Sequence, residues 1–301
     1  IHERANHPCV VIWDAQNEPV TPATGEAISR VRHLDLSRRP WNNGWAPAQS
    51  LHDVIEAHTY LVSPYARKEL HEIAEVTGIP LHWSQENFYG NAIVINEYAW
   101  FWLHRDGTPT RLTKETYDRL IGPDLDPSQY RELYAYYLGA LTEKWRCMRK
   151  AAGVLYLCGL GYDIEEAVVC DNFINVRELE FEPEFEARMK EAFAPLCISL
   201  ELWERALAAG DKRAVPIRVI NDLDQVWRGS LTLRLGSVGS ETAAIETESK
   251  PIKIEPFGFV GWQWPLTVPD ATGRYRLEVK LSPSGDRPAG VRTFREFTVE
   301  S

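Results

Sequence analysis

The sequence predicts an α/β domain followed by a smaller all-β domain. Its 301 residues exceed what a single hydrophobic core usually holds. In the first two thirds of the chain, short apolar runs that end in polar residues alternate with helical stretches. From about Ala214 the hydrophobic period changes to two, and Gly, Pro, Asp and Ser turns separate the segments. We therefore expect domains at residues 1–209 and 210–301.

In the first domain, strands and helices alternate along the chain. The predicted strands are 9–14, 34–37, 54–60, 92–98 and 153–159, and the predicted helices are 24–31, 64–78, 130–152 and 183–209. Alternation of this kind indicates βαβ units and a parallel sheet. Polar residues at the carboxyl ends of several strands are typical of the active-site face of a barrel.

A closed (β/α)8 barrel needs roughly 250 residues, and only five strands fit before residue 165. The sequence therefore predicts the C-terminal portion of a (β/α)8 TIM barrel, about strands 4–8. We expect the first three β/α units to lie upstream of Ile1 or to come from another chain. Because the chain does not begin with Met, its compartment is not predicted.

The second domain contains short alternating segments typical of an immunoglobulin-like β-sandwich. These segments are 215–221, 230–235, 242–247, 252–254, 275–281 and 293–299.

Charge and cysteine content argue against several classes of function. The formal net charge is −10 and the basic residues are scattered, which disfavours nucleic acid and anionic membranes as partners. No run of 18 apolar residues occurs. The five cysteines form no CxxC pair and are expected to be mostly buried thiols. We predict neither a metal nor a cofactor.

One motif carries a specific resemblance. The segment 6–18, Asn-His-Pro-Cys-Val-Val-Ile-Trp-Asp-Ala-Gln-Asn-Glu, resembles the acid/base signature of family 2 glycoside hydrolases, the family of β-galactosidases, β-glucuronidases and β-mannosidases. Ala5 departs from the basic or bulky residue that the family usually has before the Asn. The segment 93–98, Ile-Val-Ile-Asn-Glu-Tyr, is similar to the family's nucleophile strand. The resemblance implies that Glu18 is the acid/base and Glu97 the nucleophile.

The same resemblance implies roles for neighbouring residues. Asp35–Arg38 falls where strand five belongs, and His58–Tyr60 where strand six belongs. Tyr60 would give a hydroxyl to the nucleophile, and Asn17 would donate to the sugar 2-hydroxyl. The chemistry also requires two carboxyls independently of the family, since retaining hydrolysis needs a nucleophile and a proton donor about 5–5.5 Å apart.

Other candidates have structural alternatives. His58 either contacts the sugar or its neighbours or is a satisfied core group. Trp100 is the first candidate for stacking on a sugar ring, although it could instead cap the core. Arg38 and Arg39 could bind a carboxylate or sugar hydroxyls, or pair with Asp35 or Glu86. Further aromatic candidates near strand ends are Trp41, Trp45, Trp83 and Trp102.

The expected substrate is an oligosaccharide or glycoside with a terminal β-linkage. The glucuronidase branch carries an Asn-x-Lys element, which Asn175-Val176-Arg177 matches only weakly. This favours a β-galactosidase-like enzyme, with β-glucuronidase or β-mannosidase specificity as alternatives. A non-catalytic carbohydrate-binding or assembly fragment is the alternative from another class, because an incomplete barrel exposes two sheet edges.

Overall fold

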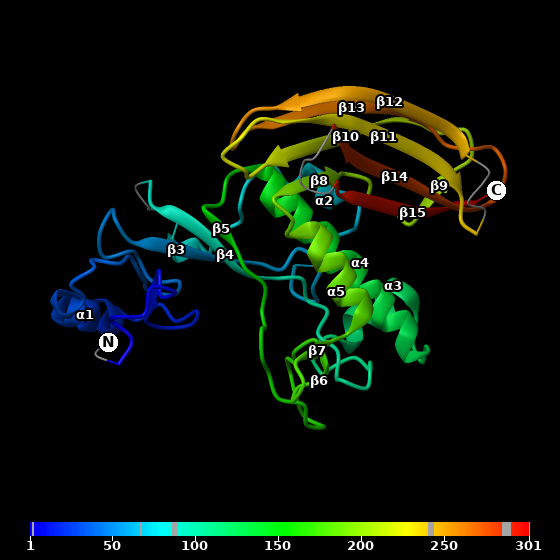
Figure 1. Ribbon diagram of the computed structural model, residues 1–301. Helices are drawn as coiled ribbons and strands as arrows, with labels where there is room; N and C mark the ends of the chain where they lie inside the picture. Colours follow the sequence, from blue (N-terminus) through cyan, green and yellow to red (C-terminus); the bar gives the residue numbers. More distant parts are fainter. Residues whose placement is uncertain (2, 67, 86–89, 240–243, 285–289, 301) are drawn as a thin grey trace. The chain divides into compact units, whose positions relative to one another are not determined.

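The computed structural model describes residues 1, 3–66, 68–85, 90–239, 244–284 and 290–300, with the backbone alone at 244–246. The chain forms two compact units (Figure 1). The first comprises residues 1–60, 78–98 and 149–157, and the second comprises 61–77, 99–148 and 158–301. Among the described helices, none is both long and apolar enough to cross a membrane.

The first unit contains a five-stranded sheet in which every neighbouring pair is parallel. The strands lie in chain order: β1 (Trp13–Asp14), β2 (Trp41–Asn42), β3 (Val54–Thr59), β4 (Ala92–Tyr98) and β5 (Gly153–Val154). The predicted parallel sheet is confirmed, and its closure into a barrel stays a prediction. This unit also contains α1 (Pro22–Val31) and the 3-10 helices η1 (Arg32–Leu34) and η2 (Trp83–Gln85).

Two strand predictions in this unit need correction. The run 9–14 is not buried throughout, and Val11 is 66% exposed. Only Trp13–Asp14 of this run form a strand, and within the described part of the chain this strand lies at the edge of the sheet, paired with β2 alone. Residues 34–37 form no strand. The side chain of Asp35 accepts hydrogen bonds from the backbone N–H groups of Ser37 and Arg39 and so closes a turn, and the strand follows only at Trp41.

The described residues of the segment 64–78, which are 64–66 and 68–78, do not form the predicted long helix. Among them, only α2 (Glu72–Glu75) is helical. The hydroxyl of Ser63 accepts a hydrogen bond from the N–H of Ala66, a local bond that competes with helix formation. The strand predicted at 153–159 is likewise reduced to the two residues of β5.

Three longer helices belong to the second unit. They are α3 (Lys114–Ile121), which the sequence analysis did not predict, α4 (Pro127–Met148) and α5 (Pro183–Ala192). Helix α4 lies beside α5 (Figure 1) and also packs against strand β8. It is therefore buried around most of its circumference. A short ribbon is formed by β6 (Phe173–Asn175) and β7 (Glu180–Phe181).

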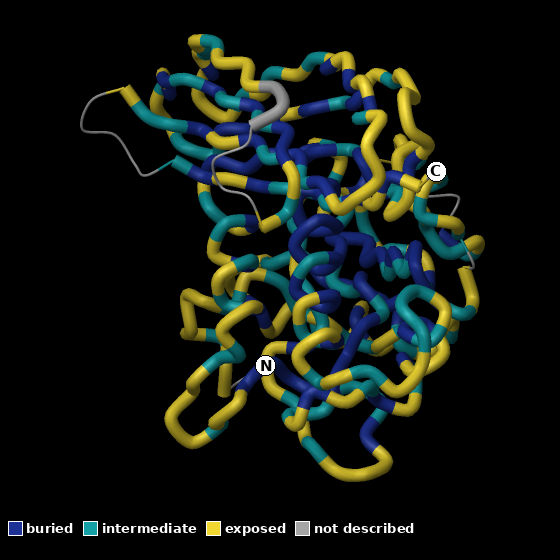
Figure 2. Tube along the Cα trace, turned by 90° about the vertical axis from the view of Figure 1, so that its right-hand side faces the viewer, coloured by how far each residue is buried: buried dark blue, intermediate teal, exposed yellow. Residues whose placement is uncertain are grey.

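The rest of this unit is a β-sandwich. One sheet has the order β13-β10-β8 and the other β12-β11-β14-β15-β9. The strands are β8 (Leu196–Leu200), β9 (Ala206–Ala208), β10 (Lys212–Asn221), β11 (Trp227–Ser237), β12 (Ala244–Ile254), β13 (Phe259–Thr267), β14 (Gly273–Pro283) and β15 (Arg292–Glu300). Both sheets contribute to one core that includes Trp227 and Trp264. Buried and exposed residues alternate along the strands (Figure 2). Its immunoglobulin-like identity stays a prediction.

The sandwich begins earlier in the chain than the expected residue 210. Strands β8 and β9 lie in the segment 183–209 that the sequence analysis assigned to a helix. Helix α5 ends at Ala192, three residues before Pro195. The following five residues, Leu-Cys-Ile-Ser-Leu, are all buried, as expected for a core strand rather than an amphipathic helix.

Buried ion pairs join α4 to the sandwich. Glu143 lies 2.9 Å from Nη2 of Arg295, and their side chains are only 3% and 1% exposed. The hydroxyl of Thr293 donates to the same carboxylate. One turn of α4 is therefore held by one charged and one hydroxyl partner from β15.

Candidate active site

Three side chains meet at the carboxyl ends of strands of the parallel sheet in the first unit. Glu18 follows β1, His58 is in β3 and Glu97 is in β4. His58 stands opposite Glu97, directly after an irregularity in the pairing of β3 with β4. Such bulges redirect side chains. One oxygen or nitrogen atom of each of the three residues lies within 4.8 Å of the other two.

The two carboxylates contact the same imidazole. Nδ1 of His58 lies 2.8 Å from Oε1 of Glu18 and 3.2 Å from Oε2 of Glu97. The hydroxyl of Tyr60 donates a hydrogen bond of 2.5 Å to that same oxygen of Glu97. Four residues that the sequence analysis identified, or weighed as candidates, are therefore connected in one cluster.

Glu56 is a further acidic residue of this cluster, and the sequence analysis missed it. Its carboxylate is buried and accepts hydrogen bonds from Nδ2 of Asn42 at 2.6 Å and Nδ2 of Asn96 at 2.9 Å. It also accepts one from the backbone N–H of Glu18 at 3.3 Å, and it lies 3.5 Å from Nε2 of His58. A charged residue inside the apolar run Val54-Ile55-Glu56-Ala57 was the available signal.

The charges in the cluster shift several pKa values. Burial raises the pKa of Glu97, although the hydroxyl of Tyr60 and the charge of His58 oppose this shift. Burial alone would lower the pKa of His58, but the carboxylates of Glu56, Glu97 and Glu18 outweigh it and raise that pKa. Burial would raise the pKa of Glu56, but bonds from His58, Asn42 and Asn96 hold it below its usual value. The surroundings therefore stabilise the ionised form of Glu56 but not that of Glu97.

The backbone around Glu18 is constrained. Glu18 has φ 60°, a conformation that costs a non-glycine residue about 1–3 kcal/mol and that persists only where the surroundings enforce it. Gly44 has φ 58°, and a Cβ there would lie 2.9 Å from Cγ of Gln16 and 3.3 Å from the nitrogen of Glu18. The loop after β2 thus approaches the segment carrying Glu18 so closely that only glycine fits.

The other predicted site residues are outside this cluster. Asn17 is exposed. Arg38 is also exposed and precedes β2, at the strand end opposite the one that carries the cluster. Arg39 pairs with Asp35 at 2.7 Å, which confirms the structural alternative for that arginine. Glu86, its other suggested partner, lies outside the described residues. Trp100 belongs to the second unit, where its indole N–H donates to the carbonyl of Leu112, and its role in sugar binding stays a prediction.

Among the aromatic candidates, Trp45 contacts the cluster. Its ring meets the ring of His58 edge-on at 5.4 Å and stacks on His82 at 4.4 Å. Trp41 and Trp102, in contrast, are buried. Trp45 was one of four tryptophans that were left unranked behind Trp100, because its proximity to the strands that carry the cluster depends on the course of the loop after β2.

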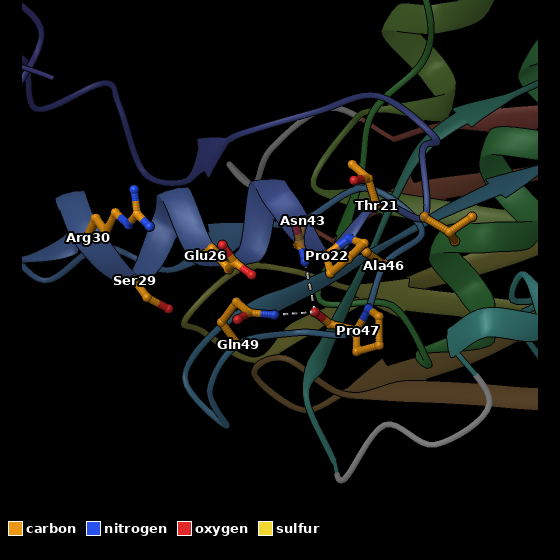
Figure 3. Close-up of a pocket in the computed structure, with 10 residues that line it drawn as sticks. Thr21, Pro22, Glu26, Ser29, Arg30, Asn43, Ala46, Pro47 and Gln49 are labelled. Atoms are coloured by element: carbon orange, nitrogen blue, oxygen red, sulfur yellow. Dashed lines mark hydrogen bonds between the residues drawn. The ribbon is translucent and has the colours of Figure 1, made fainter.

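An open groove of about 610 Å³ lies next to α1 (Figure 3). Glu26 and Arg30 line it from the helix, Thr21 from the N-cap before the helix, and Gln49 from the loop after β2. The amides of Asn43 and Gln49 both donate to the carbonyl of Pro47. Of the cluster residues, none is among those that line this groove in the described part of the chain.

Carboxylates and imidazole are also groups that bind divalent cations. Here, however, the distances of 2.5–3.2 Å among Tyr60, Glu97, His58 and Glu18 are those of hydrogen bonds. The arrangement is suited to moving a proton between Glu18 and His58 and to holding Glu97 in place beside them.

One solved glycosidase structure is similar to nearly the whole chain. No family model and no curated protein matches the chain. Among solved structures, a β-D-mannosidase from Dictyoglomus thermophilum is similar over 97% of this chain, with a TM-score of 0.61 and 14% sequence identity. A β-glucosidase from Listeria innocua matches 36% of this chain and 16% of its own, with a TM-score of 0.27 and 14% identity. The chain spans 38% of the length of the mannosidase, and its fold is like that of a glycoside hydrolase.

Proposed function

We propose that this chain carries the catalytic carboxylates of a retaining β-glycosidase of the family 2 type. Glu97 is the nucleophile and Glu18 the acid/base. The observation that carries the proposal is the meeting of these two carboxylates, with oxygens within 4.8 Å of one another, at one imidazole. Retaining enzymes have carboxyls about 5–5.5 Å apart, whereas inverting enzymes have about 6.5–9.5 Å to admit a water.

In the first step, Glu97 attacks the anomeric carbon while the bond from that carbon to the leaving oxygen breaks. Glu18 gives its proton to the leaving oxygen. The hydroxyl of Tyr60 fixes the position of Oε2 of Glu97, which directs the other oxygen, Oε1, toward the sugar. Orientation of this kind supplies much of the rate enhancement of enzymes.

In the second step, a water attacks the anomeric carbon and the bond to Glu97 breaks. Glu18, now ionised, takes a proton from that water. Asn17 is proposed to donate to the sugar 2-hydroxyl, and Trp45 or Trp100 to stack on the ring. Aromatic faces suit the apolar faces of pyranoses.

A β-galactosidase-like specificity is the leading proposal, because the Asn-x-Lys element of glucuronidases is missing from the sequence at 175–177. The likeness to a protein described as a β-D-mannosidase keeps mannosides as the first alternative. A panel of nitrophenyl glycosides separates these sugars.

We also propose that further β/α units complete the sheet, supplied by the same polypeptide or by another chain. In the described part of the chain, β1 and β5 each have one unpaired edge. Unpaired strand edges attract further strands. If no unit completes the sheet, a carbohydrate-binding or assembly role is the second candidate.

The substitution Glu97→Gln tests the assignment. It keeps the shape of the side chain but removes the nucleophile, so turnover should fall by at least about 1,000-fold. Glu75→Gln, an exposed position in α2, is the matched control. Retention of most turnover in Glu97→Gln would refute the proposal.

A further inference from the structure

Glu56 has no role in the two steps above, although its carboxylate accepts three hydrogen bonds within the cluster. Its side chain is 2% exposed and receives two amide donors and one backbone donor. A buried carboxylate with this many donors remains ionised. A permanent negative charge therefore lies directly behind His58.

His58 has a carboxylate at each ring nitrogen. Nδ1 faces Glu18 and Glu97, whereas Nε2 faces Glu56 at 3.5 Å. Within the described part of the chain, Nε2 is buried and makes no hydrogen bond, so the carboxylate of Glu56 acts on it as a nearby charge. An ionised carboxylate at that nitrogen favours a proton on Nε2, because a lone pair there would face a negative charge.

We propose that Glu56 is a positioning residue that keeps the proton on Nε2 of His58, so that Glu18 and His58 share the proton used in the acid step. This inference rests on the proposed function. With Nε2 protonated, the lone pair of Nδ1 is available to the carboxyl of Glu18 at 2.8 Å. The pair then holds one transferable proton, either on Oε1 of Glu18 or on Nδ1 of the imidazolium.

The proton balance of the reaction follows directly. The pair loses this proton to the leaving oxygen in the first step and regains one from water in the second. Nε2 keeps its own proton throughout. Without the charge of Glu56, neutral His58 could instead carry its proton on Nδ1, and Glu18 would have no acceptor that stabilises its protonated form.

The charged and titratable groups that face His58 come from three strands. Glu56 and Tyr60 come from or directly follow β3, Glu97 comes from β4, and Asp14 and Glu18 come from or follow β1. The edge of the Trp45 ring covers another side. Of these groups, only Glu56 approaches Nε2, so a change at Glu56 should alter that nitrogen first.

The first test observes His58 directly. In the complete protein labelled with ¹⁵N-histidine, nuclear magnetic resonance should show Nε2 of His58 protonated across the titration, with the signal assigned by His58→Gln. In Glu56→Gln the pKa of His58 should fall by about one unit, a tenfold change in proton affinity. Asp53→Asn is the matched control, since Asp53 is also buried but bonds to Arg32 and to the backbone of Trp41.

The second test follows kcat/KM against pH. Glu56→Gln should move the alkaline limb to lower pH, because the shared proton is lost earlier. Glu56→Asp should largely restore the limb, and Asp53→Asn should leave it in place. A merely structural role of Glu56 would lower stability without moving the limb.

The outcomes separate the two proposals. If the wild-type protein hydrolyses no glycoside, the proposed function fails while the resonance experiment still decides the tautomer. A wild-type His58 protonated on Nδ1 and not on Nε2 would overturn this inference, even if Glu56→Gln did not fold. An active wild type whose alkaline limb is unmoved in Glu56→Gln would overturn it as well.

Discussion

The hydroxyl of Tyr60 donates a 2.5 Å hydrogen bond to Oε2 of Glu97, the oxygen that also lies 3.2 Å from His58. This bond opposes the burial that raises the pKa of Glu97. It therefore helps to keep the proposed nucleophile ionised and in a fixed orientation.

Tyr60→Phe should lower kcat by about 10- to 100-fold, the range expected for a lost hydrogen bond of about 1.5–3 kcal/mol to a charged group. Activity requires ionised Glu97. Loss of the donor raises the pKa of Glu97, so the acidic limb of the pH–rate profile should move to higher pH. Tyr162→Phe, at an exposed tyrosine, is the control. An unchanged acidic limb in Tyr60→Phe would contradict this role.

Gly44→Ala should disturb the segment that carries Glu18. The new Cβ would lie 2.9 Å from Cγ of Gln16, and φ 58° is unfavourable for alanine. We expect a lower melting temperature and a loss of about tenfold in kcat/KM, the effect of a barrier increase of about 1.4 kcal/mol. Gly78→Ala, where the added atom meets open space, should change neither. Full activity of Gly44→Ala would show that the close approach is not needed.

Glu143→Ala should destabilise the protein strongly. The substitution leaves the buried charge of Arg295 without its carboxylate, which typically costs about 3–5 kcal/mol. Lys114→Ala breaks an exposed pair with Asp118 and should change the free energy of unfolding by at most about 1 kcal/mol. Urea unfolding monitored by tryptophan fluorescence measures both. Equal changes in the free energy of unfolding for the two substitutions would contradict the stabilising role of the buried pair.

The native protein should have one thiol that reacts quickly. Cys9 is exposed and the other four cysteines are buried. Burial raises the pKa of Cys170 to about 12 and that of Cys147 well above its usual value, so little thiolate forms. A thiol-specific chromogenic disulfide should therefore titrate one group in the native state and five after unfolding. Cys9→Ser should abolish the fast reaction. More than one fast-reacting thiol would contradict the burial of the other four cysteines.

The sequence predicted the elements whose patterns are local. Strands β3 and β4 are apolar runs with polar ends, and helix α4 has a long helical repeat. Their positions agree with the structure to within a few residues. The alternating segments after residue 210 likewise fall on strands of the sandwich. However, 252–254 and the described part of 242–247 belong to the single strand β12, and β13 was not predicted.

The errors arose where non-local contacts decide the structure. Residues 196–200 are a strand because β10 pairs with them, which their own composition does not reveal. The error at 34–37 has a local cause instead, because the side chain of Asp35 accepts hydrogen bonds from the backbone N–H groups of Ser37 and Arg39 and closes a turn. At the site, Glu18 and Glu97 were predicted from motifs. Glu56 was missed and Trp45 was left unranked among the aromatic candidates, because their contacts with His58 depend on strand register and on the course of a loop.

Double displacement by Glu97 and Glu18 would retain the configuration at the anomeric carbon, so the stereochemistry of the first product is the decisive measurement. Proton nuclear magnetic resonance, recorded immediately after enzyme is added to a β-glycoside substrate, distinguishes the two anomers before they equilibrate. With double displacement, the β-anomer should appear first, with net retention. Initial release of the α-anomer would show inversion and would contradict it.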